Sequence, residues 1–230
     1  NEDIREFAKI FTGLSTPNPF GEFGDPFEDE MITLYSDSPM RMYEEQHEPG
    51  PKYLLNGQVV PAGQDGLKDI SDAIDNLYNH PNVGPFLGQK LIQFLVTSNP
   101  SPQYVERVAR VFNDNGSGVR GDMGAVVKAI LLDPEARSCM AISEPRFGKL
   151  REPLVRYTIF LRAFNLAPNS EYLVSTPDDW IDSVGQLAMY APSVFNFYSP
   201  EFQPNGSIAQ QDLVAPVFQI HNSSTSIGYM

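Results

Sequence analysis

His47 is the residue of this sequence best suited to acid–base chemistry. Three glutamates surround it in the sequence, Glu44, Glu45 and Glu48, and Lys52 follows shortly after. A carboxylate next to an imidazole can orient it as a general base or share a metal ion with it. The pattern predicts His47 and Glu45 as catalytic residues. The alternative is an exposed, ion-paired histidine in an acidic loop.

A basic segment stands out against an otherwise acidic chain at residues 146–162. Three arginines on its expected helix could grip a carboxylate, sulfate or phosphate through paired hydrogen bonds: Arg151, Arg156 and Arg162. Internal ion pairs are the alternative, because an arginine on an apolar helix needs an anionic partner. Glu152 and Arg156 have the spacing of such a pair. An anionic small molecule is therefore one predicted partner.

An aromatic loop at residues 191–200 is the third candidate site. Phe197 could stack on a sugar ring, while Asn196 and Tyr198 hydrogen-bond to its hydroxyl groups. The sequence predicts these three residues as ligand-binding residues, with polysaccharide as the ligand. The alternative is a loop that packs into the core.

Two oxygen-rich segments have the type of ligand that calcium prefers. One is the acidic stretch Glu22, Asp25, Glu28, Asp29 and Glu30, which Asp37 could join. The other is the loop at residues 113–122, for which a helix-connecting turn with Asp122 as the next helix cap is the alternative. Neither has the spacing of a defined calcium loop, so calcium is left open as a cofactor and no metal ligand is assigned.

The sequence lacks several familiar signatures of enzymes and cofactor sites. It has no GxSxG elbow, no HExxH pair and no Walker phosphate loop. Its lone cysteine, Cys139, rules out a cysteine-rich zinc site and a CxxCH haem attachment. We expect no haem and no nucleotide cofactor, and whether the chain is an enzyme is not decided.

The composition indicates a folded protein and argues against nucleic-acid binding and membrane-spanning classes. The 230 residues are 41% hydrophobic, which is typical of a folded chain with its own core. A formal charge of −13 repels phosphate backbones, so no nucleic acid partner is expected. The most apolar window, residues 91–96, is far shorter than the roughly 20 residues of a bilayer helix, so no transmembrane segment is expected.

The elements that would position these residues are mostly helices. Apolar spacing, caps and prolines predict helices near residues 1–13, 67–80, 83–95, 101–115, 122–133, 149–164 and 176–187, and another from about residue 215. Residues 14–66 are loop-rich and acidic, with at most a small hairpin at Asn56-Gly57. We predict a mainly α fold: a bundle of six to seven helices with a loop-rich acidic N-terminal third, forming a single domain over residues 1–230.

Several blocks of the sequence occur together in one known family. Residues 79–96, 112–122, 129–137, 148–153 and 192–198 resemble, in the same order, blocks of the bacterial family called domain of unknown function 1800. The resemblance implies a largely helical protein exported to the periplasm or cell exterior, with no established activity. It also implies that the chain corresponds to the C-terminal half of a longer protein, whose missing N-terminal half would be a partner.

Together these features give two functional hypotheses. The first is an exported bacterial protein with a binding or assembly role at the cell surface or in the periplasm, acting on polysaccharide. The second is a hydrolase in which His47 is the base and the missing N-terminal half completes the active site.

Overall fold

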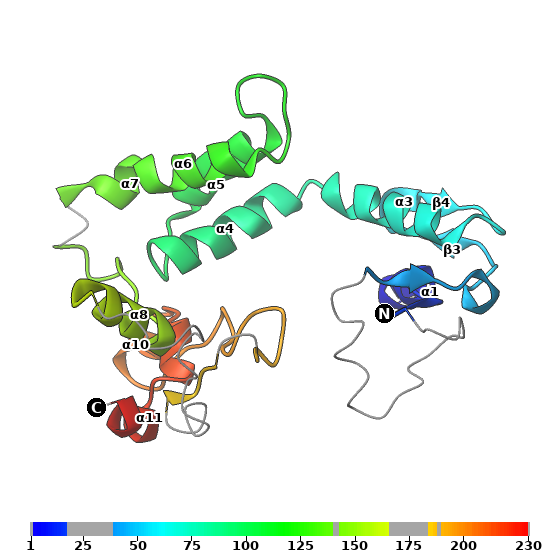
Figure 1. Ribbon diagram of the computed structural model, residues 1–230. Helices are drawn as coiled ribbons and strands as arrows, with labels where there is room; N and C mark the ends of the chain where they lie inside the picture. The colour runs from blue at the N-terminus through cyan, green and yellow to red at the C-terminus, as the bar shows by residue number, and fades with distance from the viewer. Residues whose placement is uncertain (1, 18–38, 140–142, 166–183, 188–189, 230) are drawn as a thin grey trace. The chain divides into compact units, whose positions relative to one another are not determined.

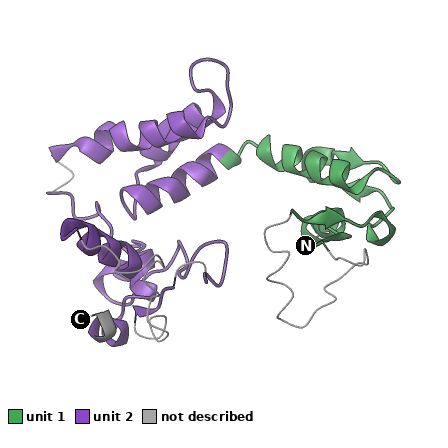
Figure 2. Ribbon diagram, in the orientation of Figure 1, with its two compact units in different colours: residues 1–83 green, residues 84–230 purple. Residues whose placement is uncertain are grey.

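The computed structural model describes residues 2–17, 39–139, 143–165, 184–187 and 190–229 (Figure 1). These residues are mainly helical and their strands form two small antiparallel hairpins, which confirms the predicted fold class. The chain divides into two compact units, residues 1–83 and residues 84–230 (Figure 2). Because compactness alone does not show that a unit folds independently, the single domain over residues 1–230 stays a prediction.

Unit 1 combines two helices of two or more turns with two short hairpins. Its elements in chain order are α1 (Glu2–Ile10), β1 (Leu14–Ser15), β2 (Arg41–Met42), the 3₁₀ turn η1 (Glu44–Gln46), β3 (Lys52–Tyr53), the 3₁₀ turn η2 (Leu55–Gly57), β4 (Val59–Val60) and α3 (Gly66–Tyr78). Strand β1 pairs with β2, and β3 pairs with β4. The buried core of the unit consists of Ile10, Leu54, Val60 and Ala73.

The hairpin of β3 and β4 turns at Asn56 and Gly57, as the sequence predicted. Their φ angles are 58° and 73°, the left-handed backbone that asparagine and glycine adopt more readily than other residues. The second hairpin, which pairs Leu14 with Met42, was not predicted. Its strands are only two residues long and far apart in the sequence, so no local sequence pattern predicts them.

Unit 2 is built from helices joined by loops. Its elements are α4 (Val83–Leu95), which starts at the last residue of unit 1, α5 (Pro102–Asn113), α6 (Met123–Leu132), α7 (Pro134–Arg137), α8 (Pro153–Ala163), α10 (Ser207–Gln210), the 3₁₀ turn η4 (Pro216–Gln219) and α11 (Ser223–Tyr229). Most of the helix predicted over residues 176–187 lies outside the described residues, as does the acidic stretch from Glu22 to Asp37.

The predicted helix starts of α5 and α6 are confirmed by their caps. Ser101 Oγ accepts a hydrogen bond from the N–H of Tyr104 at 3.1 Å, and Asp122 Oδ1 accepts one from Ala125 at 3.0 Å. Helix α8 starts at Pro153 and not at residue 149 as predicted. A proline disfavours helical backbone at the residue before it, so α8 begins at the proline itself.

Two glycines bring α4 close to α5. A Cβ atom on Gly84 would lie 3.2 Å from Phe112 Cδ1, and one on Gly88 would lie 3.2 Å from Val108 Cγ1. Larger side chains at these positions would hold the helices apart. Helix α4, which approaches α5 at these two glycines, carries two glutamines of the site described below.

The loop between α5 and α6 is held together by its own side chains. Asp114 Oδ1 accepts hydrogen bonds from the N–H groups of Gly116 and Gly118, at 2.8 and 2.9 Å. The amide of Asn115 donates to the Asp122 carboxylate at 2.8 Å. These bonds are typical of a helix-connecting turn, the alternative to a calcium loop at this position. Calcium itself stays an untested prediction.

The same loop has the GxGxxG spacing of a dinucleotide-binding turn, at Gly116, Gly118 and Gly121. In that turn the first glycine follows a strand and the last opens a helix within a βαβ unit. Here the loop follows helix α5. The spacing therefore lacks the structural context of a nucleotide site.

Candidate functional site

His47 is buried in unit 1, where four chain segments meet. The residue directly follows η1 in the chain and is 7% exposed. Its Nδ1 lies 2.8 Å from the carbonyl oxygen of Thr12, which can only accept, so Nδ1 carries a proton. Its Nε2 lies 3.0 Å from Asp69 Oδ2 and 3.0 Å from Lys52 Nζ. Both nitrogens of the imidazole are therefore engaged.

Asp69, on α3, connects the members of this cluster. Its Oδ2 lies 2.5 Å from Lys52 Nζ, and its Oδ1 accepts a hydrogen bond from Gln64 Nε2 at 2.8 Å. Burial by itself raises the pKa of Asp69, but the hydrogen bonds from its three partners outweigh burial and hold the pKa below its ordinary value. The buried carboxylate is therefore charged at neutral pH and balances the buried Lys52 ammonium.

The cluster fits a structural role better than a catalytic one. A general base needs a nitrogen within hydrogen-bond reach of the substrate proton. His47 presents no free nitrogen and little accessible surface. The bonds of the cluster instead tie the segment after α1 to η1, β3 and α3. We interpret His47 as a structural residue of unit 1.

The predicted partner of His47, Glu45, is exposed on the surface. Glu44 receives a hydrogen bond from the N–H of Gly66 at 3.1 Å, at the start of α3. The carboxylate beside His47 is that of Asp69, which was not among the predicted site residues. A signal for it was present, because Asp69 shares the buried face of α3 with Ala73 and Asn76. A carboxylate on a core-facing position needs a buried partner.

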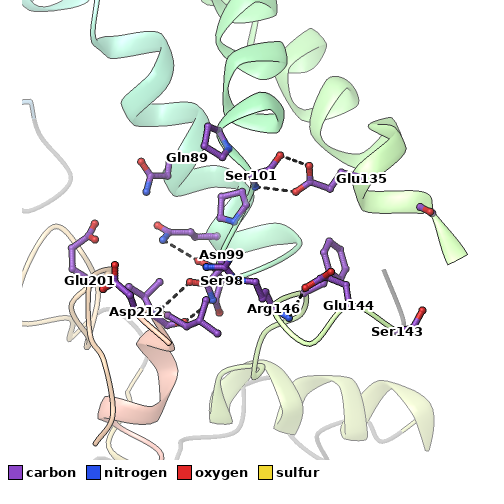
Figure 3. A pocket seen from close by; sticks show the side chains of 17 residues that line it. Gln89, Ser98, Asn99, Ser101, Glu135, Ser143, Glu144, Arg146, Glu201 and Asp212 are labelled. Carbon is purple, nitrogen blue, oxygen red and sulfur yellow. Dashed lines mark hydrogen bonds between the residues drawn. The ribbon is translucent and has the colours of Figure 1, made fainter. Parts of the chain in front are cut away.

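A cavity of about 770 Å³ lies in unit 2 beside the end of α4 (Figure 3). Its volume falls in the usual range of small-molecule sites, about 300–1,000 Å³. Its side chains come from α4, the loop after α4, α7, the loop before α8 and the segment around α10. Most of them are polar: Gln89, Gln93, Ser98, Asn99, Ser101, Glu135, Ser138, Ser143, Glu144, Arg146, Glu201 and Asp212.

Hydrogen bonds between distant segments fix the walls of this polar cavity. The Asn99 amide exchanges two hydrogen bonds with the backbone of Val214, each 2.9 Å long. Ser101 donates its N–H to Glu135 at 3.0 Å and its hydroxyl to the same carboxylate (Figure 3). A cavity with fixed walls loses little conformational entropy when a ligand enters.

Three side chains of the polar cavity keep unused hydrogen-bonding capacity, judged over the part of the chain that the structure describes. Gln93 is 9% exposed, and its Nε2 donates to the carbonyl oxygen of Ser98 at 3.2 Å. Its Oε1 is buried and has no hydrogen-bond partner there. The Gln89 amide and the Arg146 guanidinium likewise make no side-chain hydrogen bond to a described residue.

The charge of the polar cavity is negative. Four carboxylates line it, from Glu135, Glu144, Glu201 and Asp212. Arg146 is the cation among the lining residues, and Glu201 is also paired with Lys90 at 2.6 Å. An anionic ligand would be repelled by this lining, whereas a neutral ligand would find both donors and acceptors.

A second, more apolar cavity of about 320 Å³ shares two lining residues with the polar cavity, Gln93 and Ser98. Its apolar lining consists of Leu87, Leu91, Phe94, Val194, Phe195, Pro200, Pro216 and Val217. Lys149 also lines it, and burial lowers the pKa of this lysine below its ordinary value. Part of the predicted aromatic loop therefore does line a cavity.

The polar atoms of the aromatic loop turn toward Glu152, which is buried. Tyr198 donates its hydroxyl to Glu152 Oε1 at 2.5 Å, and the Asn196 amide donates to Oε2 at 3.3 Å. Burial, together with this carboxylate, raises the pKa of Tyr198. Phe197 is half-buried and is not among the residues that line the apolar cavity. Because Asn196 and Tyr198 are hydrogen-bonded to Glu152, the loop would contact a ligand mainly through its aromatic rings.

The three predicted arginines do not converge on one described cavity. Arg151 is exposed and borders a further cavity of about 310 Å³ together with Lys149. Arg156 Nη2 lies 3.2 Å from His221 Nδ1, and Arg162 is exposed. The carboxylate expected to pair with Arg156, that of Glu152, is bound by the aromatic loop and by Gln186 Nε2 at 2.5 Å. His47 and Glu45 belong to unit 1, whereas the predicted ligand-binding residues belong to unit 2.

The described residues contain neither a candidate membrane-spanning helix nor a candidate metal-binding group of side chains. No helix among them is both long and apolar enough to cross a membrane. No group of three or more histidine, cysteine or acidic side chains within residues 2–17, 39–139, 143–165, 184–187 and 190–229 is placed to hold a metal ion.

The fold and the sites define a mainly α protein with a buried ionic cluster in one unit and a polar cavity in the other. The family model described as "Protein of unknown function (DUF1800)" matches residues 1–228. The chain belongs to this family, which confirms the resemblance of its sequence blocks. No curated protein and no solved structure matches the chain.

Proposed function

We propose that this protein binds a neutral, hydroxyl-rich ligand, such as an oligosaccharide, in the polar cavity of unit 2. The observation that carries the proposal is the buried Oε1 of Gln93, a residue that lines the cavity and whose acceptor has no partner among the described residues. A buried polar atom left without a hydrogen bond costs about 1–3 kcal/mol. A ligand hydroxyl would supply the missing donor.

The remaining lining supports the same chemistry. Gln89 and Arg146 offer donors, and the carboxylates of Glu144 and Asp212 offer acceptors. Each hydroxyl group of a sugar can donate one hydrogen bond and accept others, so it suits a site with both kinds of partner. The excess of carboxylates opposes an anionic ligand, which favours polysaccharide over an anionic small molecule as the partner.

The proposal also covers the cellular location of the protein and its role there. The protein acts outside the bacterial cytoplasm, in the periplasm or at the cell surface, and its role is binding or assembly. The support for this part is the resemblance to an exported family. Fractionation of cells that express the full-length gene product tests it, because a cytoplasmic protein would contradict it.

A hydrolase built on His47 is the second candidate function. The contact of His47 with Asp69 favours it, because a carboxylate orients the imidazole in many hydrolases. The engaged nitrogens and the burial of His47 speak against it. Hydrolysis of nitrophenyl esters and glycosides by the full-length protein, lost in a folded His47→Gln variant, would favour the hydrolase.

Calorimetric titration tests the binding proposal. The probes are neutral oligosaccharides of glucose, galactose, mannose and N-acetylglucosamine, with acetate and inorganic phosphate as anionic comparisons. We expect binding of at least one oligosaccharide and about tenfold weaker binding by Gln89→Ala, the loss of one hydrogen bond. Gln103→Ala, an exposed glutamine on α5 outside the cavity, is the matched control. Binding of the anions alone, or equal effects of both variants, would contradict the proposal.

A further inference from the structure

The apolar cavity points to a second part of the ligand. It shares Gln93 and Ser98 with the polar cavity, so the two cavities adjoin at these residues. Gln93 is also the residue with the buried, unpartnered acceptor. A buried acceptor without a hydrogen-bond partner in the described part of the chain therefore belongs to a residue that lines both cavities.

The lining of the apolar cavity suits a ring or a short alkyl chain. Leu87, Leu91 and Phe94 contribute from α4, and Phe195 contributes from the aromatic loop. Phe94 and Phe195 are 52% and 46% exposed, so part of each ring surface is uncovered. A cavity of about 150 Å³ can hold one benzene ring. The observed volume of about 320 Å³ leaves room for a ring with a substituent.

The polar groups at the edge of this cavity are largely satisfied by the protein. Asn196 and Tyr198 bind the carboxylate of Glu152. Lys149 donates to the carbonyl oxygen of Phe94, and its ammonium lies 5.2 Å from the centroid of the Phe94 ring. With these groups engaged, the space favours the apolar part of a ligand over a second sugar.

We infer that the ligand is a glycoside with an apolar aglycone, whose sugar occupies the polar cavity and whose aromatic or alkyl group occupies the apolar cavity. This inference rests on the proposed function and adds the class of ligand to it. Gln93 Oε1 accepts a hydrogen bond from a hydroxyl group of the sugar near the glycosidic bond. The apolar group gains affinity by leaving water against the leucine and phenylalanine side chains.

Titration with matched pairs of methyl and phenyl glycosides of the four sugars tests the inference on the full chain. We expect the phenyl glycoside of the preferred sugar to bind at least about tenfold more tightly than its methyl counterpart. Phe195→Ala should remove this difference while leaving the affinity for the methyl glycoside unchanged. Phe218→Ala, a partly exposed phenylalanine that lines neither cavity, should retain the difference.

The outcomes separate the inference from the function on which it rests. Equal affinities for methyl and phenyl glycosides overturn the inference and leave polyol binding intact. A preference for phenyl glycosides that survives Phe195→Ala also overturns it, because the aglycone then binds elsewhere. Binding of phenol without any binding of methyl glycosides or oligosaccharides overturns the proposed function and the inference together. Circular dichroism of each variant confirms that it is folded.

Discussion

The imidazole of His47 and the carboxylate of Asp69 lie 3.0 Å apart in the interior of unit 1, although 22 positions separate them in the sequence. Lys52, whose side chain is fully buried, contacts both. The three side chains link α3 to the segment that follows α1. The ionic cluster should therefore contribute to the stability of the unit, and ligand binding should depend on unit 2.

Replacement of Asp69 by asparagine should destabilise unit 1. The variant leaves the buried Lys52 ammonium without its counter-charge, and the loss of one member of a buried ion pair costs about 3–5 kcal/mol. Hydrogen exchange of the α3 amides measures the effect. Asp75→Asn, an exposed position on the same helix, is the control and should change exchange little. Equal effects of the two variants would show that the cluster does not stabilise the unit.

Acid should weaken unit 1 through the same carboxylate. The pKa of Asp69 lies below its ordinary value of 3.8 in the folded state. Well above that value the carboxylate is charged in both states, and its stabilising contribution is complete. As the pH falls from about 3.8 through the lower folded pKa, the unfolded chain takes up the proton first and the contribution is lost. Thermal unfolding followed by circular dichroism should show the wild type approaching Asp69→Asn below about pH 4. A constant difference between the two proteins would contradict this assignment.

Gly13→Ala should destabilise unit 1 more than Gly57→Ala. Both glycines have positive φ, 79° and 73°, which costs an alanine about 1–2 kcal/mol. A Cβ on Gly13 would also lie 2.6 Å from the carbonyl oxygen of Tyr43 and 3.0 Å from the backbone nitrogen of His47. A Cβ on Gly57 would meet nothing within 4 Å. Chemical denaturation should therefore give Gly13→Ala the larger loss, and similar losses would show that the segment before His47 has room to move.

Local patterns predicted much of the helical structure. The caps Ser101 and Asp122 and the turn at Asn56-Gly57 depend on a few neighbouring residues, and all three are confirmed. Amphipathic spacing likewise predicted α3 and α4. These features follow from local physical chemistry, so the sequence was sufficient to find them.

The sites were harder to predict because they depend on tertiary contacts. The carboxylate that contacts His47, that of Asp69, is 22 positions away in the sequence. The glutamates next to His47 in the sequence therefore pointed to the wrong partner. The polar cavity gathers Gln89, Arg146 and Asp212 from segments that show no shared motif. Polar residues on α4, such as Gln93, were the available signal, since a glutamine on an apolar helix face needs a partner.

Gln93→Met should separate stability from binding. The substitution removes the hydrogen bond to Ser98, worth about 0.5–1.5 kcal/mol, but also removes a buried acceptor whose lack of a partner costs about 1–3 kcal/mol. The free energy of unfolding should therefore change by less than about 1 kcal/mol. Oligosaccharide affinity should fall about tenfold, as calorimetry can measure. A large loss of stability with unchanged affinity would mean that Gln93 serves the fold.

The most direct test of polyol binding in unit 2 is a nuclear magnetic resonance titration that follows the side-chain amide signals of the glutamines and asparagines. With the preferred oligosaccharide, we predict saturable shifts of the Gln89 and Gln93 amides and no shift of the Gln103 amide. Polyol binding in unit 2 would be contradicted if saturating oligosaccharide left the Gln89 and Gln93 signals unmoved, or shifted the side-chain amides of unit 1 instead.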